Sequence, residues 1–266
     1  MPHLTTTGGR LSATEEDRLG FGVPGYAHPL LAPVEWAELT RPGTPLHWAV
    51  LNVDDGPGSR PDPHCLEAAG RLTNAGARVL GHLDMAYGER SFGEIVADAG
   101  NFLDWYRVGG FYLDRCPATR SDLTDVRLVA ATLQALLDDA GHLAGHDAGH
   151  LGGHLVLGHG TQPYPEYAEI ADQLVTFSGP WDRYRWSQVA EWTAEHPPER
   201  FVHLVHAVPR AHLDEAMRIA RWQGAGTIFF TDRTGGDDRT GQQNPYGTLP
   251  GYWDEIVSLV GRGGSE

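Results

Sequence analysis

Eight short apolar runs recur along the chain, and longer polar-apolar segments separate most of them. The runs are FGVPG (21–25), HWAVLN (47–52), RVLGHLD (78–84), GGFYLD (109–114), HLVLGH (154–159), QLVTFS (173–178), FVHLVH (201–206) and GTIFFTD (226–232). Their length and their content of branched and aromatic residues predict buried β-strands. Alternating strands and helices predict a parallel sheet, and eight repeats in about 240 residues predict an α/β fold of the (β/α)8 barrel type.

The segments between these runs predict helices, because apolar residues recur there at spacings of three and four and Gly or Pro follows the exits. They span residues 63–76, 91–108, 123–141, 185–196 and 211–224, and the segment PYPEYAEIAD leaves room for only a short helix before residue 173. An open doubly wound sheet is the competing architecture, but no Gly-rich phosphate loop follows the first strand. We expect one barrel domain over residues 20–262, preceded by a flexible N-terminal segment, residues 1–19.

Charge and composition narrow the possible partners and the compartment. The formal net charge is −15, and no run of Lys and Arg could neutralise a phosphate backbone, so we expect no nucleic acid partner. No apolar run approaches the ~20 residues that cross a bilayer, and residues 1–20 lack the pattern of a signal peptide, which predicts a cytoplasmic protein without a membrane partner. Cys65 and Cys116 lie in unrelated segments and are expected to be free thiols. Abundant Ala and Gly with few lysines are typical of a bacterial chain.

Nearly every predicted strand ends in a polar or ionisable residue. In (β/α)8 barrels the loops at the C-terminal ends of the strands build the site, so we expect these side chains to surround a small-molecule or oligosaccharide ligand. The residues at or just after the strand ends are Tyr26, His28, Asn52, Asp84, Tyr87, Asp114, Arg115, His159, Ser178, His206 and Asp232. The oligomeric state is not predicted.

Six segments carry a resemblance to a known family. VPGYAHPLLAPVEWAEL, AVLNVDDGPGSRPD, ARVLGHLDMAYGER, VGGFYLDRCP, GTQPYPEYAEIADQLVTFSG and NPYGTLPGYWDEIV follow one another over roughly residues 20–260. Together they resemble the spherulation-specific family 4, or spherulin-like, proteins. The resemblance implies a (β/α)8 barrel related to glycoside hydrolase family 135, whose members cleave galactosaminogalactan, an α-1,4-linked polymer of galactose and (N-acetyl)galactosamine.

The same resemblance implies specific acidic residues, two of which this chain replaces. In the family the fourth strand usually ends in an Asp-Glu pair and the sixth in a Glu. Asp114 keeps the first position, whereas Arg115 and Ser178 stand at the other two. Glycoside hydrolysis normally uses two carboxyl groups, so Asp114 needs a second acid, for which we favour Asp84 over Asp232. We also expect the Arg115 cation to lower the pKa of Asp114.

Three functions remain open from the sequence. The first is a glycoside hydrolase-like barrel that acts on an amino-sugar glycan with Asp114 and Asp84 as catalytic residues. The second is a repurposed barrel enzyme that converts a small polar metabolite. The third is a catalytically silent carbohydrate-binding barrel, in which the residues at the strand ends bind a sugar without turning it over.

Histidines and aromatic residues complete the candidate site. His28, His159 and His206 could meet at the mouth, but no HxH or HExxH spacing occurs, so we predict neither a metal nor another cofactor. A tract of His142, His146, His150 and His154 is interrupted by glycines and predicts a solvent-facing connection that binds nickel or zinc adventitiously. Aromatic residues near the strand ends could stack on sugars, namely Tyr26, Tyr87, Trp181, Tyr184, Trp186 and Tyr246.

Overall fold

The computed structural model describes residues 19–25, 27–143, 153–158, 163–235 and 244–262, and its eight strands close into one parallel barrel. The order around the barrel is the order along the chain. The predicted (β/α)8 barrel is therefore confirmed, and the open sheet is excluded. The strands are β1 (Gly20–Val23), β2 (Leu46–Leu51), β3 (Arg78–Asp84), β4 (Gly110–Asp114), β5 (His154–Leu157), β6 (Gln173–Pro180), β7 (Phe201–His206) and β8 (Thr227–Phe230).

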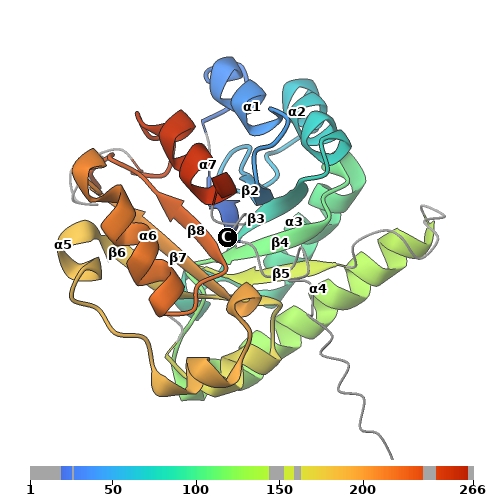
Figure 1. The fold of residues 1–266 in the computed structure, drawn as a ribbon. Coiled ribbons are helices and arrows are strands. Elements are labelled where there is room, and N and C mark those ends of the chain that lie inside the picture. The colour runs from blue at the N-terminus through green and yellow to red at the C-terminus, as the bar shows by residue number, and fades with distance from the viewer. Residues whose placement is uncertain (1–18, 26, 144–152, 159–162, 236–243, 263–266) are drawn as a thin grey trace, which may run out of the picture.

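Helices surround the strands on the outside of the barrel (Figure 1). The α-helices are α1 (Pro33–Leu39), α2 (Pro63–Asn74), α3 (Phe92–Tyr106), α4 (Leu123–Leu143), α5 (Trp181–Tyr184), α6 (Leu213–Trp222) and α7 (Trp253–Arg262). Short 3-10 turns add η2 (Ala86–Gly88), η3 (Arg120–Asp122), η4 (Pro165–Glu169), η5 (Glu191–Glu195), η6 (Pro198–Arg200) and η7 (Arg210–His212). The brief η4 turn confirms that only a short helix fits between β5 and β6.

The helix predicted over residues 185–196 is wrong. Helix α5 ends at Tyr184, and a separate 3-10 turn, η5, begins at Glu191. The backbone carbonyl of Ser187 accepts a hydrogen bond from the Gln223 side chain at 2.8 Å, and the Ser187 hydroxyl donates to the carbonyl of Tyr184 at 2.8 Å. These contacts replace the i to i+4 ladder that a continuous helix would need.

Glycines on or directly after the strands make room for large side chains in the barrel interior. A Cβ at Gly22 would lie 2.3 Å from the Trp48 ring, and a Cβ at Gly158 would lie 2.0 Å from the Tyr112 ring. The indole of Trp48 is fully buried and donates a hydrogen bond to Gln173 Oε1 at 2.6 Å. The barrel is therefore a packed core, and a ligand site must lie at one of its ends.

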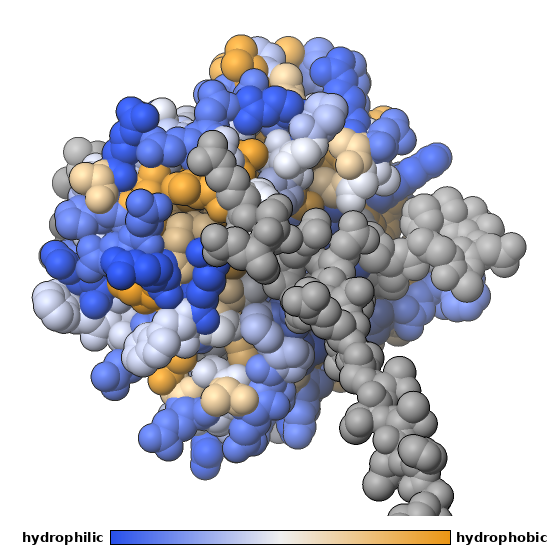
Figure 2. All heavy atoms as spheres, in the orientation of Figure 1, coloured by the Kyte–Doolittle hydropathy of each residue, from blue (hydrophilic) through white to orange (hydrophobic). Residues whose placement is uncertain are grey.

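One face of the molecule is largely hydrophilic. Hydrophilic residues cover most of the face shown in Figure 2, with smaller apolar areas between them. Among the helices that the structure describes, none has the length and apolar content that a membrane crossing requires. Cys65 and Cys116 are both buried and free, as expected. The flexible segment predicted before residue 20 lies outside the described residues except for Leu19.

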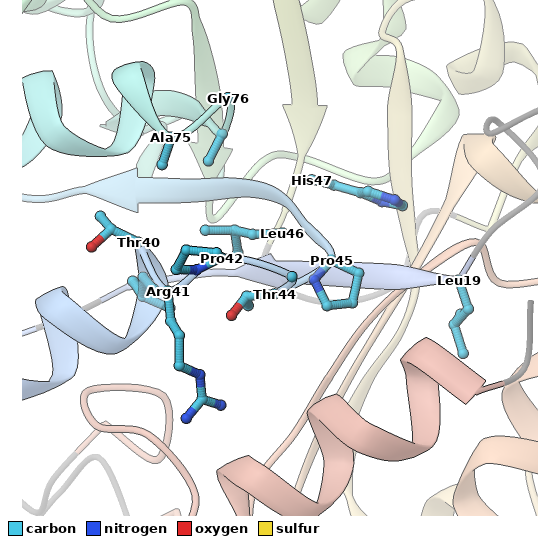
Figure 3. Close-up of a pocket in the computed structure, with 13 residues that line it drawn as sticks. Leu19, Thr40, Arg41, Pro42, Thr44, Pro45, Leu46, His47, Ala75 and Gly76 are labelled. Atoms are coloured by element: carbon cyan, nitrogen blue, oxygen red, sulfur yellow. The ribbon is translucent and has the colours of Figure 1, made fainter.

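A cavity of about 440 Å³ opens at the end of the barrel where the strands begin (Figure 3). Leu19, the segment 39–47 and the turn 75–77 line it. These residues precede β1, β2 and β3 or, for Leu46 and His47, begin β2, so the cavity lies at the opposite end from the predicted site. In (β/α)8 barrels the catalytic residues lie at the C-terminal ends of the strands. We therefore attribute this cavity to the packing of side chains at the other end of the barrel.

Candidate active site

Asp84 and Asp114 lie side by side at the C-terminal ends of β3 and β4. The two residues are direct partners in the parallel register of these strands. Neighbouring strands lie about 4.8 Å apart, so the two carboxyl groups start from adjacent backbone positions. Both side chains are mostly buried, with 21% and 24% of their surface exposed. The sequence-predicted pair is therefore brought together in space.

Two nitrogens of the Arg115 guanidinium group contact the two carboxylate oxygens of Asp84. Its Nε donates to Oδ1 of Asp84 at 2.8 Å, and its Nη2 forms an ion pair with Oδ2 of the same carboxylate. Asp114 instead accepts the backbone N–H of Arg115 at 2.9 Å. We expected this cation to act mainly on Asp114; the direct guanidinium contacts are with Asp84.

The surroundings of Asp84 favour its ionised form. Burial raises the pKa of this carboxyl, but hydrogen bonds from Arg115 and from the backbone N–H of Ala86, at 2.8 Å, outweigh burial and leave the pKa below its ordinary value. The nearby charge of Asp114 opposes this decrease without cancelling it. The pKa of Arg115 is correspondingly raised by its hydrogen bonds to Asp84. Asp84 is thus a poor proton donor and a stable anion.

His82 is a neighbour of Asp114 that the sequence analysis missed. Its Nε2 lies 3.1 Å from Oδ2 of Asp114, and only 12% of the imidazole is exposed. Residues two apart on a strand face the same side, so His82 and Asp84 point the same way from β3. The spacing of two residues between His82 and Asp84 is the sequence signal that could have identified His82. The site therefore holds a carboxyl group fixed by an imidazole beside one fixed by a guanidinium.

Backbone strain is concentrated at the same end of the barrel. Of the six described non-glycine residues with a positive φ angle, five follow β2, β3, β4 or β7, namely Asp55, Ala86, Tyr87, Arg115 and Ala207, with values from 45° to 57°. The sixth, Arg107, caps the C-terminus of α3. The strained loops are joined, because the N–H of Tyr87 donates to the carbonyl of Arg115 at 2.8 Å. Such strain costs on the order of 1–3 kcal/mol per residue and clusters at functional sites. It favours this face as the working end of the barrel.

Tyr87 covers the ion pair from outside. Its ring is 58% exposed, and the guanidinium carbon of Arg115 lies 5.8 Å from the ring centre. An exposed aromatic face beside two carboxyl groups is a surface on which the C–H groups of a sugar can stack.

Ser178 and His206 belong to a second group, which Tyr246 connects. The Tyr246 hydroxyl donates to the backbone carbonyl of Leu204 at 3.3 Å and interacts with the Ser178 side chain, and the Tyr246 ring meets the His206 ring edge to face at 6.2 Å. Burial raises the pKa of Tyr246 to about 12, while Ser178 acts in the opposite direction. Burial lowers the pKa of His206, and the charge of Asp182 partly offsets this. His206 therefore favours its neutral form.

Asn52 and Asp232 both hold loops. The Asn52 side chain accepts the N–H of Gly56 at 2.9 Å. The Asp232 carboxylate accepts the N–H of Gly251 at 3.1 Å. A role of Asn52 or Asp232 in ligand binding remains a prediction.

His28 lies near the start of α2, where its Nε2 is 3.4 Å from Oδ2 of Asp62. Tyr26 and His159 fall outside the described residues. Among the aromatic candidates, Trp181 and Tyr184 are buried and cannot serve as sugar platforms. Tyr184 packs against Phe177 of β6 and His203 of β7, and Trp181 packs against Tyr184 and His212. Trp186 is 78% exposed, with the guanidinium of Arg185 over its ring at 5.1 Å.

Comparisons with known proteins agree with the fold and the resemblance. Residues 21–260 match spherulation-specific family 4. Spherulin-4 of Physarum polycephalum is 26% identical over 261 residues, which cover 94% of this chain and 72% of that protein. Aspergillus clavatus Sph3, solved in complex with GalNAc, aligns with a TM-score of 0.72 at 22% identity over 92% of this chain and 98% of its own. The Bacillus cereus spore cortex-lytic enzyme SleL aligns with a TM-score of 0.54 at 9% identity, over 90% and 73%. At these identities the two structures bear on the fold alone.

Proposed function

The chain belongs to spherulation-specific family 4, and we propose that it is a carbohydrate-active barrel that hydrolyses an amino-sugar glycan of the galactosamine type. The glycan binds across the C-terminal ends of the strands, and Asp114 is the central catalytic group. The observation that carries this proposal is the register pairing of Asp84 and Asp114 in two different environments.

Hydrolysis of a glycosidic bond needs one carboxyl group that transfers a proton and one that stays ionised. Arg115 keeps Asp84 ionised, because the guanidinium group binds both carboxylate oxygens. The proton-transferring role then falls to Asp114, and His82 orients its carboxyl group from below.

The choice of ligand draws on the relatives and on the exposed surface of the site. Sph3 was solved in complex with GalNAc, an amino sugar of the class that the proposal requires. The half-exposed ring of Tyr87, next to Arg115, provides a stacking surface for a sugar ring. We propose an oligosaccharide as the ligand and leave nucleic acid and membrane out of the proposal.

Mass spectrometry of products tests this function. Galactosaminogalactan oligomers, fully and partly N-acetylated, are incubated with the wild type, with Asp114→Asn and with Asp84→Asn. We expect cleavage by the wild type and a cleavage rate at least about 10³-fold lower in both variants, because each variant lacks one of the two carboxyl groups that the reaction needs. Asp104→Asn is the matched control, because that carboxylate is exposed on α3 far from the strand ends.

Binding without turnover is the second candidate, and one observation favours it. The Arg115 side chain occupies both oxygens of Asp84, which a hydrolase would need free to assist the reaction. In that case the wild type binds the oligomers but releases no products, and Asp114→Asn lowers the affinity. A dissociation constant measured beside the product assay separates this candidate from the hydrolase.

A further inference from the structure

Three side chains with metal-binding atoms converge away from the carboxyl pair, between the loop after β1 and the start of α2. They are His28, Asp62 and Cys65, and their ligand atoms all lie within 4.8 Å of one another. His28 Nε2 and Asp62 Oδ2 are 3.4 Å apart. This is a nitrogen, an oxygen and a sulfur ligand from two segments more than thirty residues apart in the sequence.

The two carboxylate oxygens of Asp62 have different tasks. Oδ1 caps helix α2 by accepting the N–H groups of His64 at 2.8 Å and of Cys65 at 3.0 Å. Oδ2 takes no part in this cap and faces the imidazole of His28. The helix cap explains one oxygen only, and the position of the other beside an imidazole and a thiol needs a separate explanation.

We propose that His28, Asp62 and Cys65 form a binding site for a divalent cation of the zinc class. Zinc takes nitrogen, oxygen and thiolate ligands at about 2.0–2.3 Å, so the ligand atoms of a tetrahedral site lie roughly 3.3–3.8 Å apart. The His28 to Asp62 spacing already fits, and the rest of the cluster contracts by about 1 Å at most. Three protein ligands leave the fourth position to water.

The cluster offers a path for the cation. His28 and Asp62 keep 23% and 28% of their side chains exposed, whereas Cys65 is fully buried behind them. A cation therefore enters from the imidazole and carboxylate side and meets the sulfur last. The net charge of −15 favours the approach of cations.

Binding must displace protons, which sets its pH dependence. Burial, together with the charge of Asp62, raises the pKa of the Cys65 thiol to about 12. A bound cation takes the place of that proton, because a coordinating thiol is deprotonated. His28 Nδ1 lies 3.2 Å from the backbone N–H of Leu30, and this contact is given up when Nδ1 carries the proton and Nε2 binds the metal. Affinity consequently rises with pH, and one proton is released from the thiol for each cation bound.

Cobalt(II) titration tests the site directly, because a cobalt–thiolate bond gives a charge-transfer band in the near ultraviolet that imidazole and carboxylate ligands do not give. The tract of histidines at residues 142–154 therefore cannot imitate the signal. The chain has only two cysteines, so Cys65→Ser is compared with Cys116→Ser, which removes the other buried thiol. His28→Gln is compared with His64→Gln, an exposed histidine one residue before Cys65.

We expect a band that saturates at one cobalt per chain, that zinc abolishes by competition, and that strengthens with rising pH. Cys65→Ser should lose the band, His28→Gln should weaken cobalt affinity at least tenfold, and both control variants should keep the wild-type titration. Absence of the band in the folded wild type overturns the proposal, as does a band that survives in Cys65→Ser. His28→Gln decides the question if Cys65→Ser does not fold. No arm depends on carbohydrate, so failure here is independent of the proposed hydrolysis.

Discussion

The guanidinium of Arg115 binds the carboxylate of Asp84 on the neighbouring strand, and Asp114 accepts the backbone N–H of the same arginine. The backbone geometry explains why the side chain and the backbone N–H of Arg115 bind different aspartates. Arg115 is the first residue after β4 and has a φ of 45°, which turns it out of the strand. Its N–H remains beside Asp114 while its side chain reaches β3. The guanidinium of Arg115 thus holds the Asp84 carboxylate, whose residue is the register partner of Asp114.

Replacing Arg115 by Gln tests the electrostatic part of this arrangement. The pKa of Asp84 is lowered in the folded protein, so the ionised form persists to lower pH than in a free carboxyl. Loss of the guanidinium raises that pKa, and the acidic limb of the pH–rate profile should move to higher pH. Oligomer cleavage measured from pH 3 to pH 8 checks this. An unchanged acidic limb would mean that Asp84 does not have to be ionised for turnover.

His82 is expected to orient Asp114 without exchanging protons with it. His82→Gln retains a side-chain N–H that can donate to Asp114, whereas His82→Leu removes the donor. We predict that the Gln variant keeps most of the wild-type kcat and that the Leu variant loses roughly 10- to 100-fold, because misplacement of a catalytic group has costs of this size. Equal losses in both variants would instead assign a titrating role to the imidazole.

His203 should make the fold sensitive to acid. It is fully buried against Tyr184, with Nδ1 2.8 Å from the phenol oxygen, and burial lowers its pKa from 6.5 to about 3. Between these values the unfolded chain binds a proton that the folded chain does not bind. The free energy of unfolding therefore decreases as the pH falls from about 6.5 toward 3.

The variant His203→Asn keeps an acceptor for Tyr184 but cannot titrate, so urea unfolding should show a shallower pH dependence. Tyr184→Phe is the control, since it leaves the imidazole buried and should keep the wild-type slope. His154, whose pKa burial lowers to about 4, contributes to the same slope and prevents its complete loss. A wild-type slope in His203→Asn would contradict the assignment.

Two glycine substitutions of opposite sign test the packing of the barrel. A Cβ at Gly22 would lie 2.3 Å from the ring of Trp48 and 2.7 Å from Thr227, so Gly22→Ala should destabilise by about 1–3 kcal/mol. Gly70 lies within α2 with nothing within 4 Å of a Cβ, and Gly70→Ala should stabilise by roughly 0.5–1 kcal/mol. Urea denaturation measures both. A neutral Gly22→Ala would mean that the interior has free space beside Trp48.

The barrel could be predicted from the sequence because its strands are short, apolar and evenly spaced. The predicted limits of β3 and β7, residues 78–84 and 201–206, agree with the structure at both ends. The segment 185–196 failed because its helical spacing was overridden by a tertiary contact, the hydrogen bond from Gln223 to the Ser187 carbonyl. Sequence periodicity does not predict where Gln223, the residue that follows α6, lies relative to Ser187.

The site was predictable in its backbone positions and less so in its side-chain partners. Strand ends placed Asp84 and Asp114 together, since parallel register follows from the barrel. The partner of Arg115 depended on a positive φ angle, for which a non-glycine sequence gives no signal. His82 could have been found from its spacing of two from Asp84. The contact of His28 with Asp62 joins two loops, and loop paths do not follow from apolar periodicity.

Product analysis by mass spectrometry, with α-1,4 galactosaminogalactan oligomers and the variants Asp114→Asn and Asp84→Asn, is the most direct test of the central claim. The account predicts shorter oligomers from the wild type and from Asp104→Asn, and none above background from the two site variants. Cleavage that persists at the wild-type rate in folded Asp114→Asn would contradict the account, because no other group would then be assigned the transfer of the proton.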